Sequence, residues 1–490
     1  MSVFAGDFRL DNLHDAPLYR QIYTRVKQAI IQGQLNAGER VPSVRSLASE
    51  LGVARATVEN AYGLLLDEGF LQSRGQAGTY VSRTLNLPSA SQVANQGKTY
   101  PSQSVPEQSA PDLIQPDLPL SFQLGLPALD AFPRAIWSRI VARRLRHSTA
   151  VSLSHPPLAG DPELRRAIAS YLQLSRGFSC RPEQVFICAG YSAVLDLIAG
   201  SLMQPGEGVW LEDPGYPVTQ AFLSAAGATP MPVPVDSEGM NIDEAIARWP
   251  NARFAALTPT HQSPLGVSLS LSRRMAILAW AAERKMWILE DDYDSEFRYQ
   301  GQPLPSLKSL DTQERVLYAG TFSKVMFPAL RIGYLVVPES LVAQVDAYCH
   351  TRSCACPPLL QASVADFIEQ GHFYRHLKRM RQLYAQRRGY LTQAIASSFP
   401  TGELQVEPQH GGIQLCTRLD PRIVDSDVTT LARQRGLSLQ PLSEWRVVKS
   451  ENGNRRNGLL MGFTNIVSQQ QAELLCQQLA AIVQEVGAKR

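Results

Sequence analysis

Residues 320–334 read GTFSKVMFPALRIGY and place Arg331 seven positions after Lys324. A lysine amine can form a Schiff base with a carbonyl carbon. An arginine guanidinium can hold a phosphate through two parallel hydrogen bonds, and Ser323 can add a hydroxyl to the same group. The residue types in this run therefore suit a carbonyl compound that also carries a phosphate.

A second run, WILEDDYDSEF at residues 287–297, supplies the groups that such a lysine would need beside it. Asp291 ends an apolar stretch and lies 33 residues before Lys324. Its carboxylate can keep the nitrogen of a pyridine ring protonated, and Tyr293 can bind the ring hydroxyl. These companions predict a site for pyridoxal 5'-phosphate (PLP), with Lys324 as the covalent and catalytic residue.

Two further segments fit the same cofactor. The run CAGYSAVLDL at residues 188–197 predicts a helix start at which the amides of Tyr191 and Ser192 face a phosphate. The turn EDPGYP at residues 212–217 places Tyr216 where it can stack on the ring. Each motif alone is more often a surface pair or a solvated turn, so the prediction depends on their joint order.

The elements that must position these residues are short apolar strands alternating with helices, which is typical of an α/β fold. We expect a mostly parallel central sheet with helices on both faces. In such sheets ligands bind beyond the carboxyl ends of the strands, where the polar residues above are placed. The predicted strands are QVFICAG, GVWLED, ARFAALTP, MWILEDD, RVLYAGTF and IGYLVVP.

The first 83 residues have a different pattern, with three helical segments followed by a hairpin signal. The order of helix, short helix, turn at Gly52, helix and hairpin predicts a winged helix-turn-helix. The segments are PLYRQIYTRVKQAIIQG, PSVRSLASELG capped by Ser43, VARATVENAYGLLLDEGFL ending at Gly69, and LQSRGQAGTYVS.

A recognition helix offers polar or basic side chains at its N-terminal turn, and Arg55 and Thr57 occupy that position. Arg45 on the preceding helix is placed for a phosphate or base contact. Arg74 and Gly75 lie at the tip of the predicted wing. These residues predict an interface with double-stranded operator DNA, although ordinary surface arginines on a protein-binding winged helix would give the same pattern.

Between the two patterns lies a stretch rich in Pro, Ser and Gln, from residue 84 to about residue 120. Because it is poor in charge and has no periodicity, it predicts a linker. The expected domains are 1–83 for DNA binding, 84–120 for the linker and 121–490 for PLP and effector binding.

The bulk composition is that of an ordinary soluble protein, which we expect to lie in the cytoplasm. The formal net charge is +3, and 44% of the residues are hydrophobic. The seven cysteines are scattered and predict reduced thiols, with no spacing typical of a metal site. We find no signal peptide and no apolar run long enough for a membrane span.

Residues 33–82 resemble the DNA-binding domain of the GntR superfamily in the motif GxLxxGxRxPSxRxLA and in the wing RGxxGTxV. The resemblance implies that Arg45, Arg55, Thr57 and Gly75 contact DNA. One departure is Ala54, where the family usually has a serine or threonine. The substitution removes a hydroxyl that would cap the recognition helix.

Residues 121–490 resemble class I aminotransferases of fold type I, and their pairing with a GntR head resembles the MocR group, which includes the GabR regulators. The resemblance rests on GDPELRRAIASYLQLSRG, LEDPGYP, TPTHQSPLG, EDDYDSEFRY and GTFSKVMFPALRIGYLV. It implies PLP bound covalently by Lys324, with Asp291, Tyr293 and Arg331 in the roles argued above. Sites of this fold type are usually completed by a second subunit, so we expect a homodimer.

Three departures from the aminotransferase pattern concern the ligand. The phosphate turn reads Ala-Gly-Tyr-Ser where the family has Ser-Gly-x-Gln. Ser263 replaces the asparagine before Pro264, with His261 and Gln262 as possible substitutes at the cofactor. Met461 lies near the place where aminotransferases carry the arginine that binds the substrate carboxylate.

These features leave three readings open. The first is a regulator that senses a small amine or amino acid, and the second is a sensor of PLP itself, which needs no carboxylate clamp. The third is a working aminotransferase with a DNA-binding appendage. We expect a regulator rather than an enzyme, and multiple turnover with a keto acid would decide the matter.

One further segment belongs to neither predicted site. Residues 372–391 read HFYRHLKRMRQLYAQRRGYL and predict a helix with six basic residues and no acidic residue. An apolar stripe that includes Leu377, Met380 and Tyr384 would pack inward and leave much of the basic face to solvent. That face is either an ordinary solvated surface or a second contact for DNA phosphates.

Overall fold

The computed structural model describes residues 16–83, 120–299, 305–352, 356–447 and 457–488. The chain divides into two compact units, residues 1–108 and residues 109–490, which we call the small unit and the large unit. Residues 84–119, which make up nearly all of the predicted linker, lie outside the described part of the chain.

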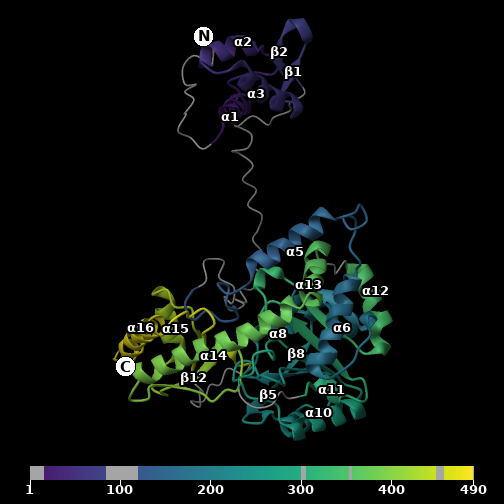
Figure 1. The fold of residues 1–490 in the computed structure, drawn as a ribbon, viewed down its shortest axis with the longest axis vertical. Helices are drawn as coiled ribbons and strands as arrows, with labels where there is room; N and C mark the ends of the chain where they lie inside the picture. The colour runs from purple at the N-terminus through teal and green to yellow at the C-terminus, as the bar shows by residue number, and fades with distance from the viewer. Residues whose placement is uncertain (1–15, 84–119, 300–304, 353–355, 448–456, 489–490) are drawn as a thin grey trace. The chain divides into compact units, whose positions relative to one another are not determined.

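The small unit consists of three helices and a two-stranded hairpin (Figure 1). Ser43 accepts a hydrogen bond from the backbone N–H of Ser46 at 3.1 Å and so caps the second helix, which stops at Gly52 in the left-handed conformation. This order confirms the predicted winged helix-turn-helix. The elements are α1 (Leu18–Ile31), α2 (Val44–Leu51), α3 (Arg55–Asp67), β1 (Leu71–Ser73) and β2 (Thr79–Val81).

The core of the small unit is aliphatic. Ile22 and Val26 of α1 pack with Leu47 of α2 and with Val58 and Leu65 of α3, and all five are fully buried or nearly so. Because the apolar face of α3 turns inward, its opposite face is left exposed on the surface.

The large unit contains a sheet of eight strands in the order β3-β10-β9-β8-β7-β4-β5-β6. The five strands from β9 to β5 are parallel to one another, and β6 and β10 run antiparallel to their neighbours. The mostly parallel sheet is therefore confirmed. The strands are β3 (Val185–Cys188), β4 (Gly208–Asp213), β5 (Thr229–Asp236), β6 (Gly239–Met240), β7 (Phe254–Leu257), β8 (Trp287–Asp292), β9 (Val316–Thr321) and β10 (Gly333–Val336).

Successive residues of these strands pack into different clusters, as the two-residue period of a strand requires. Phe254 and Ala256 of β7 join the cluster on one face of the sheet, and Ala255 and Leu257 join the cluster on the other. Helices therefore cover both faces, as predicted.

Twelve helices are described in this unit. The longest of them is α14. They are α5 (Arg134–Arg146), α6 (Pro162–Arg176), α7 (Tyr191–Leu202), α8 (Pro217–Ala225), α9 (Ile242–Arg248), α10 (Leu271–Arg284), α11 (Leu307–Leu310), α12 (Val342–Arg352), α13 (Pro358–Glu369), α14 (His372–Ser398), α15 (Asp425–Gln434) and α16 (Gln469–Ala488).

The direction of β10 decides where Arg331 lies. Since β10 is antiparallel to β9 and β3, it begins at the edge where those strands end, and Gly333 pairs with both Thr321 and Cys188. Arg331, just before β10, is thus brought to the carboxyl edge of the parallel strands, where Asp291 also lies.

Two features of the sheets were not predicted. Strand β5 contains Pro230, Pro232 and Pro234, residues that ordinarily argue against a strand, yet it pairs in parallel with β4. A second sheet follows late in the chain, in the order β11-β12-β14-β13. Its strands are β11 (Leu404–Val406), β12 (Gln414–Leu419), β13 (Gln440–Pro441) and β14 (Leu459–Gly462).

Within the described residues, no helix is both long enough and apolar enough to span a membrane.

Candidate cofactor site and DNA-binding surface

Lys324 lies three residues after β9, at the carboxyl edge of the sheet. Its Nζ donates a hydrogen bond to the carbonyl oxygen of Gly125 at 3.0 Å, and a Cβ on Gly125 would overlap that amine. Burial lowers the pKa of Lys324, against the opposing charges of Asp294 and Asp291. A buried lysine with a lowered pKa keeps more of its amine neutral, which is the form that attacks a carbonyl carbon.

Asp291 and Asp292 are neighbours on β8 but have different surroundings, because adjacent strand residues point to opposite faces. Asp292 accepts a hydrogen bond from Arg176 Nε at 2.5 Å and another from the Tyr318 hydroxyl, within a buried network. Asp291 points toward α7 and lines a pocket with Tyr191. The sheet thus presents Asp291, and not Asp292, to the ligand.

The electrostatics of Asp291 fit a cationic ring nitrogen. Burial raises the pKa of Asp291 to about 8, the negative charges of Asp292 and Glu212 add to the rise, and a hydrogen bond with Tyr191 opposes it. Among the described residues, no lysine or arginine forms an ion pair with Asp291. A protonated pyridine nitrogen would supply the missing positive charge.

The phosphate end of the predicted site is built from the start of α7 and from Arg331. Gly190 precedes the helix with φ +86°, and its ideal Cβ position is only 3.2 Å from Arg331 Cζ. Arg331 is exposed and donates to the carbonyl oxygen of Ala189 at 3.2 Å. The helix begins at Tyr191, as predicted, so its first amides, including that of Ser192, point at the space beside the guanidinium.

Ser323 and Tyr216 complete the residues predicted around the cofactor. Ser323 is half-buried beside Lys324, and its backbone N–H donates to Thr321 Oγ1 at 3.1 Å. Tyr216 lines the pocket and packs on Trp445, with 5.7 Å between ring centroids. Burial and the charge of Asp291 raise the pKa of Tyr216 to about 12.

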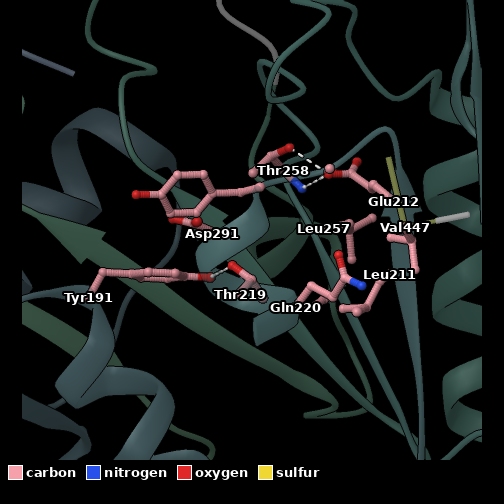
Figure 2. A pocket seen from close by; sticks show the side chains of 12 residues that line it. Tyr191, Leu211, Glu212, Thr219, Gln220, Leu257, Thr258, Asp291 and Val447 are labelled. Carbon is pink, nitrogen blue, oxygen red and sulfur yellow. Dashed lines mark hydrogen bonds between the residues drawn. The ribbon is translucent and has the colours of Figure 1, made fainter. Parts of the chain in front are cut away.

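The side chain of Tyr191 is a site component that the sequence analysis did not predict. Its hydroxyl lies 3.1 Å from Thr219 Oγ1, and Figure 2 shows it directed at Thr219 with Asp291 beside its ring. The Tyr191 and Tyr216 rings lie 6.3 Å apart. Burial, followed by the charge of Asp291, raises the pKa of Tyr191 well above its ordinary value.

Tyr191, Tyr216, Thr219 and Asp291 line one pocket, and Lys324, Arg331 and Ser323 are not among its lining residues. Glu212, another residue not predicted, lies at the far side from Tyr191 in Figure 2 and accepts hydrogen bonds from the backbone N–H and hydroxyl of Thr258. Burial raises the pKa of Glu212 to about 7.

Tyr293 belongs to a buried polar cluster near Lys324. The Nδ1 atom of His261 lies 3.2 Å from the Tyr293 hydroxyl and 3.2 Å from Asp294 Oδ2. His261 Nε2 and Asp294 Oδ1 are buried and have no hydrogen-bond partner within the described structure. His261 therefore lies where it can orient Tyr293, and Asp294 is an acid that sequence reasoning missed.

Gln262 and Met461 are the remaining residues named among the departures from the aminotransferase pattern. The side-chain amide of Gln262 is already bonded within the fold, since it donates to the carbonyl oxygens of Pro214 and Ser263 and accepts from the Leu265 N–H. Of the two substitutes considered for the asparagine, His261 thus remains. Met461 is fully buried on β14 and faces the core, so it offers a ligand no charge.

In the small unit, the predicted DNA-binding residues share an exposed position outside the core. Arg45 is exposed in the first turn of α2, and Arg55 is the first residue of α3 with a side chain that is 69% exposed. Thr57 lies half-buried in the same turn. Arg55 and Thr57 thus occupy the N-terminal turn of α3, which is the position expected to contact bases.

The wing tip is a single turn of 3-10 helix between β1 and β2. Gly75 begins it with φ +60°, and no atom lies within 4 Å of its ideal Cβ position. Arg74 lies over the ring of Tyr80, 4.9 Å from its centroid, and remains exposed. Ala54 stands at the cap position of α3 and makes no side-chain cap, which agrees with the lost hydroxyl noted in the sequence.

Comparison with known proteins places both units. Residues 134–454 match the model of aminotransferase class I and II, and residues 18–81 match bacterial regulatory proteins of the gntR family. Among solved structures, a multiple substrate aminotransferase from Thermococcus profundus is 25% identical, with a TM-score of 0.68 over 77% of this chain and 94% of that chain. An archaeal alanine:glyoxylate aminotransferase is 26% identical with the same TM-score, over 76% of this chain and 92% of that one.

Relatives that span both units are regulators by name. A probable rhizopine catabolism regulatory protein MocR of Rhizobium meliloti is 35% identical, with 93% of this chain and 92% of the relative covered. The HTH-type transcriptional regulator TauR of Rhodobacter capsulatus is 34% identical, with 92% and 93% covered. The HTH-type pyridoxine biosynthesis regulator PdxR of Corynebacterium glutamicum is 33% identical, with 88% and 90% covered.

The GntR match assigns DNA binding to the small unit, and the fold of the large unit is that of a family whose members bind pyridoxal phosphate. Both agree with the sequence analysis. The chain belongs to the MocR-type HTH transcriptional regulators, in which a GntR winged helix-turn-helix is joined to an aminotransferase class I and II domain.

Proposed function

We propose that the large unit of this regulator binds PLP at Lys324 and reports a small amine, an amino acid or PLP itself to the DNA-binding unit. The carrying observation is that Lys324, half-buried and with a lowered pKa, lies at the same edge of the sheet as Asp291, a half-buried acid that forms no ion pair with a lysine or arginine among the described residues. When bound, PLP supplies an electrophilic carbonyl carbon and an electron-withdrawing ring.

Each residue of the site has a distinct role in this proposal. Lys324 provides the amine, and Asp291 holds the ring nitrogen in its protonated state. Tyr293, oriented by His261, donates to the ring hydroxyl. Tyr216 packs against the ring. Arg331, Ser323 and the first amides of α7, from Tyr191 and Ser192, hold the phosphate.

The effector class follows from what lies on β14. Met461 is apolar where an aminotransferase has its carboxylate-binding arginine, so a free amino acid would be held less firmly for catalysis. This supports sensing over turnover. It also keeps PLP itself as an effector, and one relative, 33% identical, is named for pyridoxine biosynthesis.

We assign DNA recognition to surface residues of the domain 1–83. Arg55 and Thr57 read bases, Arg45 reads a base or phosphate, and Arg74 with Gly75 brings the wing to the backbone. We take 84–120 as the linker and 121–490 as the effector-binding domain, and the protein acts in the cytoplasm.

We also propose that the regulator is a homodimer. Leu145, Val151 and Leu153 follow one another at the end of α5 and in the next turn, with exposed fractions of 56%, 81% and 70%. Large apolar side chains exposed together favour an interface, and a second copy would match a repeated operator. Sedimentation at micromolar concentration would contradict the proposal if it gave a monomer.

The cofactor assignment is tested by reconstitution. Cofactor-free protein is mixed with PLP, reduced with borohydride, digested and analysed by mass spectrometry. We expect the label on Lys324 and its loss in Lys324→Ala, with the label kept in Lys285→Ala, which changes an exposed lysine at the end of α10. A label elsewhere, or none on the unaltered protein, would overturn the assignment.

A working aminotransferase is the second candidate, because the fold matches solved aminotransferases along most of their length. It predicts repeated turnover of an amino donor with a keto acid. The sensing proposal predicts at most a single half-reaction per site, so sustained turnover would overturn it without affecting the cofactor assignment.

A further inference from the structure

Two helices of the large unit carry basic residues and no acidic residue. Helix α5 has five arginines in thirteen residues. The first twenty residues of α14 have six basic residues. In a protein with a formal net charge of only +3, this is a local concentration of charge.

The two helices lie on the same side of the large unit. Helix α13 contacts both α5 and α14, and the three are seen together in Figure 1. Burial, with the charges of Arg375, Arg139 and Arg143, lowers the pKa of His372, so arginines of both helices lie around the start of α14. Arg375 also contacts His372, with Nη2 2.9 Å from Nδ1.

Some of these cations are used inside the fold. Arg143 and Arg144 both pair with Asp366 of α13, at 2.8 Å and 2.6 Å. Arg387 is buried and pairs with Asp130, which corrects the expectation that it belongs to the solvent-facing side of the helix.

Two other basic residues of α14 also donate hydrogen bonds to the rest of the fold. Arg388 is half-buried and donates to the Gln409 carbonyl oxygen, so it too departs from the expected basic face. Arg381 is exposed and donates to the carbonyl oxygen of Glu296.

Five cations remain, of which Arg375 also donates to the carbonyl oxygen of Gln370 at 3.0 Å. They are exposed, form no ion pair with any described residue, and constitute what we call the α5–α14 basic surface: Arg139, Arg146, Arg375, Lys378 and Arg379. Glu369, the last residue of α13, is exposed near the start of α14 and is the acidic residue closest in sequence to this set.

We propose that the α5–α14 basic surface binds the phosphates of duplex DNA beyond the base pairs read by the small unit. Arg375, Lys378 and Arg379 are spaced three and four residues apart, so they form one strip along the helix. Duplex DNA carries a negative charge about every 1.7 Å, which a strip of cations can follow without reading sequence.

The charge of the small unit supports DNA as the occupant. Residues 1–83 hold nine basic and eight acidic residues, so the unit that reads bases carries little net charge of its own. Non-specific attraction depends on how many phosphates the lysine and arginine side chains neutralise. Exposed cations on the large unit would therefore add to the few of the small unit. The proposal depends on the regulator binding DNA, but not on PLP.

The experiment uses the full chain and a fluorescent duplex of random sequence, several helical turns long. Arg375, Lys378 and Arg379 are changed together to Gln, in the unaltered chain and in a chain that already carries Arg45→Ala and Arg55→Ala. A matched control changes Arg253, Arg284 and Lys285 to Gln, which removes the same charge from exposed positions around α10.

Affinity is measured over a range of salt concentrations. Each lost phosphate contact lowers the slope of log affinity against log salt by about 0.9, so the α14 triple should lower it by up to about 3 in both backgrounds. The control triple should leave the slope unchanged. Thermal unfolding and PLP binding should be unaltered in both triples.

Two results would overturn the proposal. One is an unchanged slope in the α14 triple, which would leave the surface solvated or assigned to an acidic protein. The other is an equal loss in the control triple, which would show a general effect of net charge. Failure of Arg45→Ala and Arg55→Ala to weaken binding to a duplex that the unaltered protein selects from a random pool would instead contradict the base-reading role of the small unit, which keeps the two proposals separable.

Discussion

The small unit and the large unit place their functional side chains in opposite environments. Arg45, Arg55 and Arg74 are exposed and lie outside an aliphatic core. Lys324 and Asp291 lie within the body of the large unit, where burial itself shifts their pKa values. A DNA-reading surface can therefore change with little effect on stability, whereas the cofactor site is coupled to folding and to pH.

The largest expected effect is the pH dependence of the cofactor-free protein. The pKa of Asp291 rises from 3.8 to about 8 on folding, and that of Glu212 rises from 4.5 to about 7. Between these values the folded state binds more protons than the unfolded state, so stability falls as pH rises from about 4 to about 8. The fall should be on the order of several kcal/mol.

Chemical unfolding at several pH values measures this effect. Asp291→Asn should remove much of the fall, and Glu212→Gln should remove a further part. With PLP bound, Asp291 faces a cation and the fall should shrink. A flat profile in the unaltered cofactor-free protein would show that burial does not control Asp291.

The next effect compares two arginines on α14. Arg387 has a side chain that is 5% exposed and pairs with Asp130, and Arg379 is exposed. Arg387→Ala should lower the free energy of unfolding by about 1–3 kcal/mol, because it leaves the buried carbonyl oxygen of Thr464 without its donor and removes the partner of the half-exposed Asp130. Arg379→Ala should change it by no more than about 0.5 kcal/mol. Equal losses would refute the assignment of Arg379 to an outer surface.

On the DNA-binding surface, Arg55→Ala should cost about 1–3 kcal/mol against a specific operator. Arg74→Ala should weaken all sequences alike and lower the salt slope by about one. Neither change should alter the unfolding midpoint. Binding assays with a selected and a random duplex distinguish the two roles, and equal losses on both duplexes for Arg55→Ala would reverse its assignment.

The smallest effect concerns Tyr191. Its hydroxyl bonds Thr219 and opposes the rise in the Asp291 pKa. Tyr191→Phe should therefore weaken PLP binding by about 0.5–1.5 kcal/mol and shift the pH dependence of the cofactor absorption. Thr219→Val should act in the same direction with a smaller effect. If the absorption profile were unchanged, the backbone amide of Tyr191 would contribute to the cofactor site and its side chain would not.

Residues at strand ends were predictable from sequence because parallel strands share one carboxyl edge. Lys324, Asp291 and the start of α7 were predicted from their residue types and joint order together with that rule. Strand β5 was missed because its prolines oppose a strand locally, and only pairing with β4 reveals it.

Contacts between distant segments could not be predicted. The hydroxyl of Tyr191 forms a hydrogen bond with Thr219, which lies 28 residues later in the sequence. Lys324 donates a hydrogen bond to Gly125, which lies 199 residues earlier. The burial of Arg387 depends on Asp130, 257 residues away. Helical periodicity predicts a face, but the partner that neutralises a charge on it depends on the tertiary fold.

The most direct test of the account is whether the cofactor lysine controls DNA binding. Duplexes selected from a random pool by the unaltered protein are titrated with the unaltered chain and with Lys324→Ala, without PLP, with PLP, and with PLP plus a panel of amines and amino acids. We predict that at least one ligand condition changes the affinity of the unaltered chain, by about 5- to 150-fold for typical coupling, and that Lys324→Ala does not respond. An equal response in both proteins, or none in the unaltered chain, would contradict the claim that PLP at Lys324 is the sensor.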